Sequence, residues 1–262
     1  MNLERIRMDI ADGVAELTLV RPEGANAIDL RASEELAEVA LLCDQHCEVR
    51  AVLLRAEGPM FSAGGDVRSF RDAGDDIPAL LKRITLGLHV AVSRFARMDA
   101  PVIAAVGGTA AGGGMSLACS ADIVLASDTA RFTMAYTRIG LVPDGGSTFF
   151  LPRRIGLART RDLMLRNRVL SAAEALDWGL IEQVVPAAEL DVEARKVARE
   201  LAAGPTRAFG EVKRLLLGTY NSGLETQMEM ETRAISAMGG TDDGKEGLRA
   251  FFEKRPPAFR GR

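Results

Sequence analysis

The segment PVIAAVGGTAAGGGMSLACSADIVLA, residues 101–126, carries the strongest indication of the fold class. Its first part, Pro101–Val106, is a continuous apolar run, which is typical of a strand buried on both faces of a sheet. The glycines of Gly107–Gly114 then predict tight turns that lead into a helix. The 22 residues from Ala100 to Ala121 carry no charge, but these glycines break the stretch into short pieces, so we expect no membrane span.

Strand and helix signals alternate on either side of this segment. Val14–Val20 alternates between apolar and polar residues, which predicts a strand, and Asp29–His46 carries apolar residues at helical spacing. Further strands are predicted over Val49–Arg55, 122–126 and 131–135. Because strands and helices follow one another in turn, we expect an α/β layered domain.

After about Ser171 the pattern becomes helical. Ser171 and Glu174 form a capping-box signature at the start of a short helix, and Leu180–Val185 is the last predicted strand. The remaining helices are predicted over Leu190–Ala203, Thr206–Leu217, Leu224–Met238 and Gly247–Lys254. We therefore divide the chain into a core, residues 1–195, and a C-terminal helical region, residues 196–262. Apolar stripes on such helices pack on their own core or on a neighbouring subunit.

The composition is that of an ordinary globular protein. Of the 262 residues, 47% are hydrophobic and 26% are charged, and the net charge is −3. This balance gives no basic footprint for nucleic acid, so we expect small-molecule or protein partners. The three cysteines support no disulfide framework, and residues 1–12 show no signal-peptide core, so we expect a cytoplasmic protein. Cys43, His46 and Cys47 lie at helical spacing but lack a fourth ligand, so we expect no metal site.

Two glycine-rich loops follow predicted strands. The first is residues 60–66, MFSAGGD, and the second is residues 107–114, GGTAAGGG. Small residues let backbone N–H groups approach a ligand, and the second loop places them at a helix start, where negative charge is favoured. Neither loop has the lysine of a phosphate-binding P-loop, and Leu117 stands where a dinucleotide fingerprint has its last glycine. Two interpretations remain: an oxyanion hole made by both loops, or tight packing of helix on strand.

A third glycine-flanked turn carries a carboxylate. Residues 140–148, GLVPDGGST, place Asp144 just after Pro143 and before an apolar helix. Such an aspartate is commonly a helix N-cap. It can also project into a ligand pocket as a base. The residues alone leave both roles open.

In their order and separations, these segments resemble the crotonase superfamily, the enoyl-CoA hydratase/isomerase family. The similarity extends over nearly the whole chain and is carried by residues 21–27, 61–66, 101–114, 140–148, 175–180 and 252–255. The resemblance implies an α/β fold, a crotonase-type spiral of strand-strand-helix repeats, followed by an all-helical C-terminal region that serves oligomerisation. It also implies an acyl-CoA substrate, homotrimers or hexamers, and no cofactor apart from the coenzyme A of the substrate.

The resemblance also assigns binding residues by position. Backbone N–H groups of Ala63 and Gly113 are expected to hold the thioester oxygen, and each preorganised donor of this kind contributes about 10²–10³ in rate. Candidates for the phosphates of coenzyme A are Arg21, Arg68 and Lys254. The residues expected to contact substrate or coenzyme A are Ala25, Ala27, Ala63, Gly64, Gly65, Asp66, Val67, Gly112, Gly113 and Tyr136. The residues that either line an acyl pocket or fill the core are Phe70, Leu80, Ile84 and Met134.

The chain departs from the hydratases of this family at both acid-base positions. Ser116 and Tyr136 stand where those enzymes carry glutamates, and each such group contributes about 10²–10⁴ in rate. Asp144 matches the catalytic aspartate of family isomerases, and the run from Arg138 to Asp144 is especially similar to the bacterial epoxyphenylacetyl-CoA isomerase branch, whose members also act on 3-enoyl-CoA. We therefore predict an acyl-CoA isomerase that shifts a double bond, or rearranges a related ring or epoxide. The resemblance implies an oxyanion-stabilised enolate, with Asp144 as acid and base.

Three alternatives stay open. An enoyl-CoA hydratase would need another group in place of the missing glutamates. A dehalogenase or thioesterase resembles the chain at Asp144 and His89, but His89 lies in an apolar helical stretch and is expected to be a packed core residue. A non-catalytic acyl-CoA-binding homologue would have no use for the carboxylate of Asp144.

Overall fold

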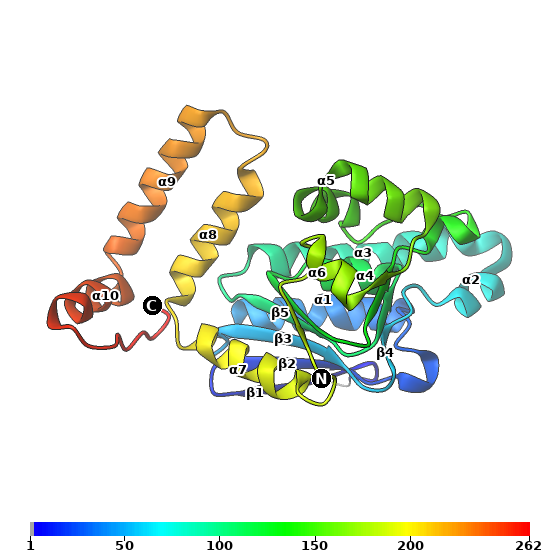
Figure 1. Ribbon diagram of the computed structural model, residues 1–262, viewed down its shortest axis with the longest axis horizontal. Coiled ribbons are helices and arrows are strands. Elements are labelled where there is room, and N and C mark those ends of the chain that lie inside the picture. The colour runs from blue at the N-terminus through cyan, green and yellow to red at the C-terminus, as the bar shows by residue number, and fades with distance from the viewer. Residues whose placement is uncertain (1–2) are drawn as a thin grey trace.

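The computed structural model describes residues 3–262, whose strands form a six-stranded and a four-stranded sheet (Figure 1). The larger sheet has the order β1-β2-β3-β5-β7-β10, and its neighbours are parallel except for β1 and β2. The smaller sheet has the order β4-β6-β8-β9, and only β8 and β9 are antiparallel. The strands are β1 (Ile6–Ala11), β2 (Val14–Leu19), β3 (Ala51–Ala56), β4 (Met60–Ser62), β5 (Val102–Val106), β6 (Thr109–Ala111), β7 (Ile123–Ser127), β8 (Arg131–Thr133), β9 (Leu170–Ser171) and β10 (Gln183–Val185).

Three successive strand pairs, β3/β4, β5/β6 and β7/β8, each give one strand to each sheet and are followed by helix. This strand-strand-helix repeat confirms the predicted spiral. The helices are α1 (Leu30–Gln45), α2 (Val67–Ala73), α3 (Ile77–Arg97), α4 (Gly113–Cys119), α5 (Ser147–Arg166), α6 (Ala172–Asp177), α7 (Leu190–Ala202), α8 (Thr206–Gly218), α9 (Leu224–Gly239) and α10 (Asp242–Glu253). None of the helices in residues 3–262 combines the length and apolarity needed to cross a bilayer.

The strands of the larger sheet separate two buried cores. In β3, Val52 and Leu54 belong to the larger core, whereas Ala51 and Leu53 belong to the smaller one. The alternation follows from the period of two in a strand. It also explains why the run at 101–106 contains no polar residue, because β5 is covered on both faces. Residues of α1 and α3 complete the larger core, and residues of α7 complete the smaller one.

Most predicted elements are present close to their expected limits. The helix predicted over Asp29–His46 is α1, and the Asp29 carboxylate caps it by accepting the N–H of Ala32 at 2.7 Å. The capping box of Ser171 and Glu174 opens α6 as predicted. The sequence pattern does not predict β1, β4, β6 or β9. The strands β4, β6 and β9 are too short to display a period of two, and β1 buries only Ile6.

The domain boundary expected after residue 195 falls inside a helix. Helix α7 runs through it without a break, and Ala194 and Ala198 pack in the same core against the larger sheet. Helix α7 therefore belongs to the core, and the separate helical part is α8 to α10, which projects from the sheets in Figure 1. Lys213 of α8 ties this part to the core through an ion pair with Asp122 at 2.7 Å.

Glu16 of β2 joins α7 to the larger sheet. Its carboxylate accepts hydrogen bonds from Arg195 and Arg55, each at 2.8 Å. These bonds, that of Arg195 foremost, hold the pKa of the Glu16 carboxyl at about 2, below its ordinary value of 4.5. Because the folded-state pKa is depressed, the stabilisation is fully present above about pH 4.5 and is lost as the pH falls towards 2.

Glu16→Gln is therefore expected to lower the free energy of unfolding at pH 7 and to flatten its decline between about pH 5 and pH 2. Urea unfolding at several pH values in this range measures both effects. The control is Glu57→Gln, which breaks only the exposed pair between Glu57 and Arg7 and should have little effect. Equal losses in the two variants would contradict the role assigned to Glu16.

Candidate active site

One cavity of about 410 Å³ collects several of the predicted site residues. Its walls come from α3, the loop after β4, the start of α4 and the segment that follows β8. Among the described residues that line it, Asp144 is the only one with an acidic side chain and Arg138 the only one with a basic side chain. Much of the wall is apolar and includes Ile28, Phe70, Leu81, Ile84, Leu88 and Leu141. An apolar cavity with a few polar groups is typical of a small-molecule site.

Asp144 lies in the loop before α5 and lines this cavity. Its carboxylate accepts a hydrogen bond from the Tyr136 hydroxyl. The N-cap residue of α5 is Gly146, and no side chain in residues 3–262 caps this helix. The alternative of Asp144 as a helix cap is therefore wrong, and its acidic side chain faces the cavity instead.

Two hydroxyls, those of Ser116 and Tyr136, lie at the positions for which the resemblance implies glutamates in hydratases. Ser116 is fully buried, and its Oγ lies 3.2 Å from the hydroxyl oxygen of Tyr136. Burial raises the pKa of the Tyr136 phenol above its ordinary value, and the charge of Asp144 raises it further. Tyr136 therefore stays protonated and remains a donor to Asp144. Because its one hydroxyl hydrogen goes to Asp144, Tyr136 can only accept from Ser116, whose hydroxyl also lies within donating distance of the carbonyl oxygen of Gly112, at 3.3 Å.

The two glycine loops lie against each other beside the cavity. Gly113 is the first residue of α4, where a backbone N–H has no partner within the helix. Gly64 has a φ of +87°, and a Cβ built on it would lie 2.9 Å from the nitrogen of Gly113. Only glycine accommodates that combination of dihedral angle and close approach, so Gly64 lets the first loop reach the second.

The N–H of Ala63 is not free to hold a substrate oxygen. It donates to the carbonyl oxygen of Ala25 at 2.9 Å. This hydrogen bond contradicts the sequence-based assignment of Ala63 as an oxyanion donor. Ala63 still lines the cavity, but as part of its wall.

Unlike Ala63, Gly65 has a backbone N–H that is free to hold a substrate oxygen. Ile28 donates its N–H to the carbonyl of Gly64 at 2.7 Å and accepts the N–H of Asp66 at 3.2 Å, which makes a parallel bridge opposite Gly65. In such a bridge the N–H of the middle residue points to the other side. No acceptor within residues 3–262 receives the N–H of Gly65, and Gly65 lines the cavity.

The other predicted residues divide between the wall and its scaffold. Those that line the cavity are Val67, Phe70, Ile84 and Gly112, and those that do not are Ala25, Ala27, Gly64, Asp66, Leu80 and Met134. Leu80 and Met134 pack in the larger core. Leu81 and Leu88 of α3 are further wall residues, which were not among the predicted site residues. Their spacing around Ile84 places all three on one helix face, which is the signal that would have found them.

His89 is exposed, so its prediction as a packed core residue is wrong. It follows the buried Leu88 on α3 and lies on the outer side of that helix, where its Nε2 accepts the N–H of Gly145 at 3.2 Å. Cys43 is buried and Cys47 is exposed. Within residues 3–262 no three His, Cys, Asp or Glu side chains are grouped as a metal ion would require.

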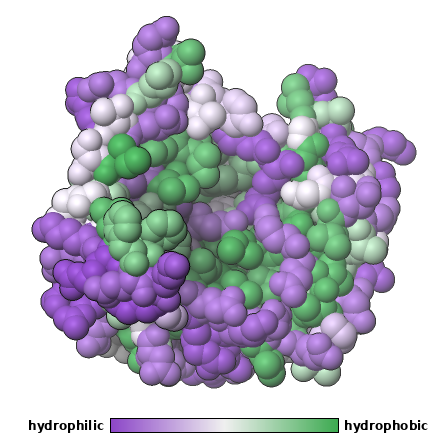
Figure 2. All heavy atoms as spheres, turned by 60° about the vertical axis from the view of Figure 1, so that its left-hand side comes forward, coloured by the Kyte–Doolittle hydropathy of each residue, from purple (hydrophilic) through white to green (hydrophobic). Residues whose placement is uncertain are grey.

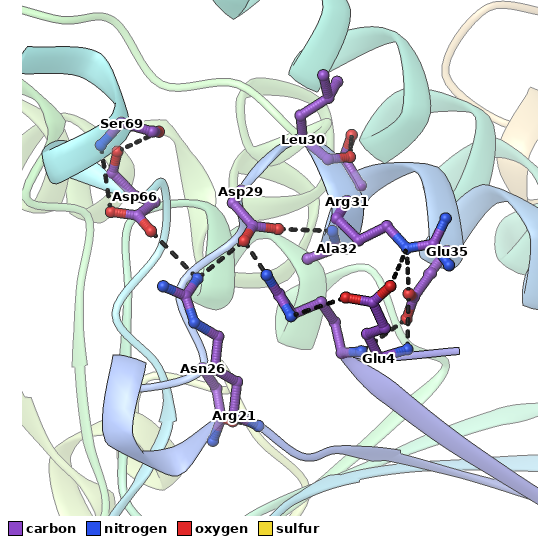
Figure 3. Close-up of polar contacts among 12 residues, drawn as sticks. Glu4, Arg21, Asn26, Asp29, Leu30, Arg31, Ala32, Glu35, Asp66 and Ser69 are labelled. Atoms are coloured by element: carbon purple, nitrogen blue, oxygen red, sulfur yellow. Dashed lines mark hydrogen bonds and ion pairs between the residues drawn. The ribbon is translucent and has the colours of Figure 1, made fainter. Parts of the chain in front are cut away.

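Arg21 is engaged in ion pairs (Figure 3). Its Nη1 lies 2.9 Å from the carboxylate of Asp29 and 3.1 Å from that of Asp66. Asp66 in turn accepts the N–H of Arg68 as the N-cap of α2. Arg21 and Asp66 are therefore part of the scaffold of the first loop, whereas the side chains of Arg68 and Lys254 are exposed.

A cavity with one carboxylate and free backbone N–H groups from two adjoining loops is typical of enzymes that remove a proton beside a carbonyl and stabilise the resulting enolate oxygen. The sequence model of the family described as enoyl-CoA hydratase/isomerase matches residues 9–262. The chain belongs to this family, the crotonase superfamily.

Individual relatives carry both activities in their names. A probable enoyl-CoA hydratase of Rhodobacter capsulatus is 38% identical over the whole of both chains. A 1,2-epoxyphenylacetyl-CoA isomerase of Escherichia coli is 37% identical over 99% of this chain and 100% of its own. The solved structure of an enoyl-CoA hydratase from Polaromonas sp. JS666 superposes with a TM-score of 0.92, at 31% identity, over 97% of this chain and 99% of that chain.

Proposed function

We propose that the protein is an acyl-CoA isomerase that converts 3-enoyl-CoA to 2-enoyl-CoA. The observation that carries this proposal is that, among the described residues lining the cavity, Asp144 alone supplies a carboxylate. This carboxylate accepts the hydroxyl of Tyr136, which in turn lies beside that of Ser116. The resemblance implies glutamates at these two hydroxyl positions in a hydratase. Migration of a double bond needs one group that removes a proton and returns it elsewhere. Asp144 suits that task.

In the proposed reaction the Asp144 carboxylate removes a proton from C2 of the acyl group. The electron pair of that C–H bond forms a C1–C2 double bond, and the thioester oxygen takes the negative charge of the dienolate. When the carbonyl re-forms, the electron pair of the C1–C2 double bond forms the C2–C3 double bond. The C3–C4 double bond breaks, and its electron pair takes the proton from Asp144 at C4. Because the Tyr136 hydroxyl occupies Oδ1 of the carboxylate, the other oxygen, Oδ2, carries the proton.

The N–H groups of Gly65 and Gly113 are the proposed donors to the thioester oxygen. A Cβ built on Gly113 would lie 3.6 Å from the Tyr136 hydroxyl, so this donor and the partner of the base are close enough to act on adjacent atoms of one substrate. The charge on the oxygen develops only during the reaction, and a fixed donor aimed at it contributes about 10²–10³ in rate.

The apolar wall is the proposed site of the acyl chain. Side chains of Phe70, Leu81, Ile84 and Leu88 form it. Such a wall keeps water from the dienolate, so that the proton returns from Asp144 and not from solvent. Arg68 and Lys254 remain candidates for the phosphates of coenzyme A, and we propose no cofactor beyond the coenzyme A of the substrate.

A direct comparison of two substrates tests this proposal. One reaction offers a straight-chain 3-enoyl-CoA, and the other offers a 2-enoyl-CoA in water. We expect migration to be much faster than hydration, because addition of water needs a further acid-base group that contributes about 10²–10⁴ in rate. Dominant hydration would overturn the isomerase assignment and favour the hydratase, the activity named for the Rhodobacter capsulatus relative.

A ring rearrangement is the second candidate function. It is favoured by the Escherichia coli relative, a 1,2-epoxyphenylacetyl-CoA isomerase at 37% identity. The assay is turnover of 1,2-epoxyphenylacetyl-CoA beside that of the straight-chain 3-enoyl-CoA. A higher kcat/KM for the ring substrate would assign the protein to this reaction.

The C-terminal helices support the proposal of a homotrimer or hexamer. Large apolar side chains are exposed on α8 to α10, and Phe251 and Phe252 are each more than three-quarters exposed. Figure 2, which brings this side of the molecule forward, shows apolar patches around a hollow. Exposed apolar patches of this kind mark protein interfaces. Light scattering of the purified protein measures the number of subunits.

Tyr136→Phe is expected to lower kcat and to leave KM nearly unchanged. The hydroxyl of Tyr136 donates to the carboxylate of Asp144 and so fixes the direction of the proposed base. Steady-state kinetics of the isomerisation measure both constants. Ser116→Ala, which leaves that direct bond in place, should lower kcat less. An unchanged kcat in Tyr136→Phe would remove the tyrosine from the mechanism.

A further inference from the structure

Arg21 joins two carboxylates that water reaches poorly (Figure 3). A single nitrogen of its guanidinium group, Nη1, lies 2.9 Å from Oδ2 of Asp29 and 3.1 Å from Oδ2 of Asp66. The two acidic side chains are only 16% and 11% exposed. Removing the cation leaves the Asp66 carboxylate without its ion pair, which is strongly unfavourable for a buried charge.

Each of these two aspartates is also the N-cap residue of a helix. Asp29 accepts the N–H of Ala32 at 2.7 Å and caps α1. Asp66 accepts the N–H of Arg68 at 3.1 Å and caps α2. Arg21 therefore links the first turns of two helices that come from separate segments of the chain.

The bridge between Ile28 and Gly65 lies immediately before both caps. Ile28 precedes Asp29 in the chain, and Gly65 precedes Asp66, so the cation holds the two segments together one residue beyond the bridge. The N–H of Gly65 points away from Ile28 because of that pairing. Its direction therefore depends on the register of the two segments.

We propose that Arg21 is a positioning residue that aims the N–H of Gly65 at the thioester oxygen. The inference rests on the proposed function, since it requires an oxygen to be held there. It replaces the expectation that Arg21 binds a phosphate of coenzyme A. Without Arg21, Asp29 keeps its ion pair with Arg5 at 3.0 Å. Asp66 loses its ion pair with Arg21 and is left facing the negative charge of Asp29. Repulsion between the two carboxylates then displaces the loop that carries Gly65.

Arg21→Gln tests this role with two substrates. One is a 3-enoyl-CoA, and the other is the same acyl group on N-acetylcysteamine, which has no phosphate. We expect kcat to fall about 10- to 100-fold with both thioesters, because a misplacement of about 1 Å costs up to 10²-fold. Arg21→Lys keeps a cation between the carboxylates and should recover part of the loss. A loss confined to the coenzyme A thioester would assign Arg21 to phosphate binding and overturn the proposal.

Two further variants separate positioning from general damage. Asp66→Asn keeps a good N-cap residue on α2 but abolishes the charge that Arg21 holds, so kcat should fall with both thioesters. If Arg21 bound phosphate, this variant would spare kcat, and that result would also overturn the proposal. Arg195→Gln removes another half-buried ion pair, that with Glu16, and should leave kcat unchanged.

A spectroscopic measurement reports the oxyanion site without turnover. The absorption of bound 4-(dimethylamino)cinnamoyl-CoA moves to longer wavelength when its thioester carbonyl is polarised. We expect a clear shift in the wild-type protein and a smaller one in Arg21→Gln. Equal shifts in both proteins would overturn the role of Arg21 alone. The absence of any shift in the wild-type protein would overturn the proposed oxyanion site and the isomerase function with it.

Discussion

Replacement of Asp144 by asparagine is expected to lower the rate of double-bond migration by about 10²–10⁴-fold, the contribution typical of a positioned acid-base group. The amide has nearly the shape of the carboxylate, and its oxygen still accepts the hydroxyl of Tyr136. The packing of the loop is therefore retained. What the variant lacks is the acceptor for the C2 proton and the donor to C4, so the loss should appear in kcat and not in KM.

Proton exchange gives the sharper measurement. In D₂O the wild-type protein should exchange the C2 hydrogen of the bound thioester, and Asp144→Asn should not. The matched control is Asp162→Asn on α5, whose side chain is 23% exposed and paired with Arg166 at 2.9 Å. It lies outside the cavity and should exchange at the wild-type rate. Wild-type exchange in Asp144→Asn would show that another group removes the proton.

The parts of the fold that are predictable from the sequence are those with a physical period. The apolar run at 101–106 predicts a strand covered on both faces, and β5 is such a strand. The helix capped by Asp29 has apolar residues at helical spacing and a cap that its side chain makes. By contrast, β4 and β6 consist of three residues each inside glycine loops. Their pairing is set by distant segments, so no local pattern indicates it.

The sequence predicts which segments of the chain form the candidate site. It does not predict the direction in which each backbone N–H or side chain of the site points. A regular extended chain would send the N–H groups of Ala63 and Gly65 to the same side, because they are two residues apart. The positive φ of Gly64 turns the chain between them. As a result, the N–H of Ala63 meets the carbonyl of Ala25 and that of Gly65 is left free. The side-chain direction of Asp144 likewise depends on the contact with Tyr136, which no spacing in the sequence shows.

Gly113→Pro is expected to lower kcat/KM by about 10²–10³-fold, because it removes one of the two proposed oxyanion donors. Position Gly113 suits this substitution. It is the first residue of α4, where proline is well tolerated because the N–H makes no bond within the helix. The variant therefore deletes the donor while the helix persists, which circular dichroism verifies.

The matched control is Gly113→Ala, which adds a carbon but keeps the N–H. A Cβ at this position would lie 3.5 Å from Cδ1 of Ile28 and 3.6 Å from the hydroxyl of Tyr136, both ordinary contact distances. Its loss of kcat/KM should therefore be much smaller than that of the proline variant. If the two losses were equal, the cause would be the added bulk beside Tyr136. The thioester oxygen would then be stabilised without the N–H of Gly113, because alanine retains that group and proline lacks it.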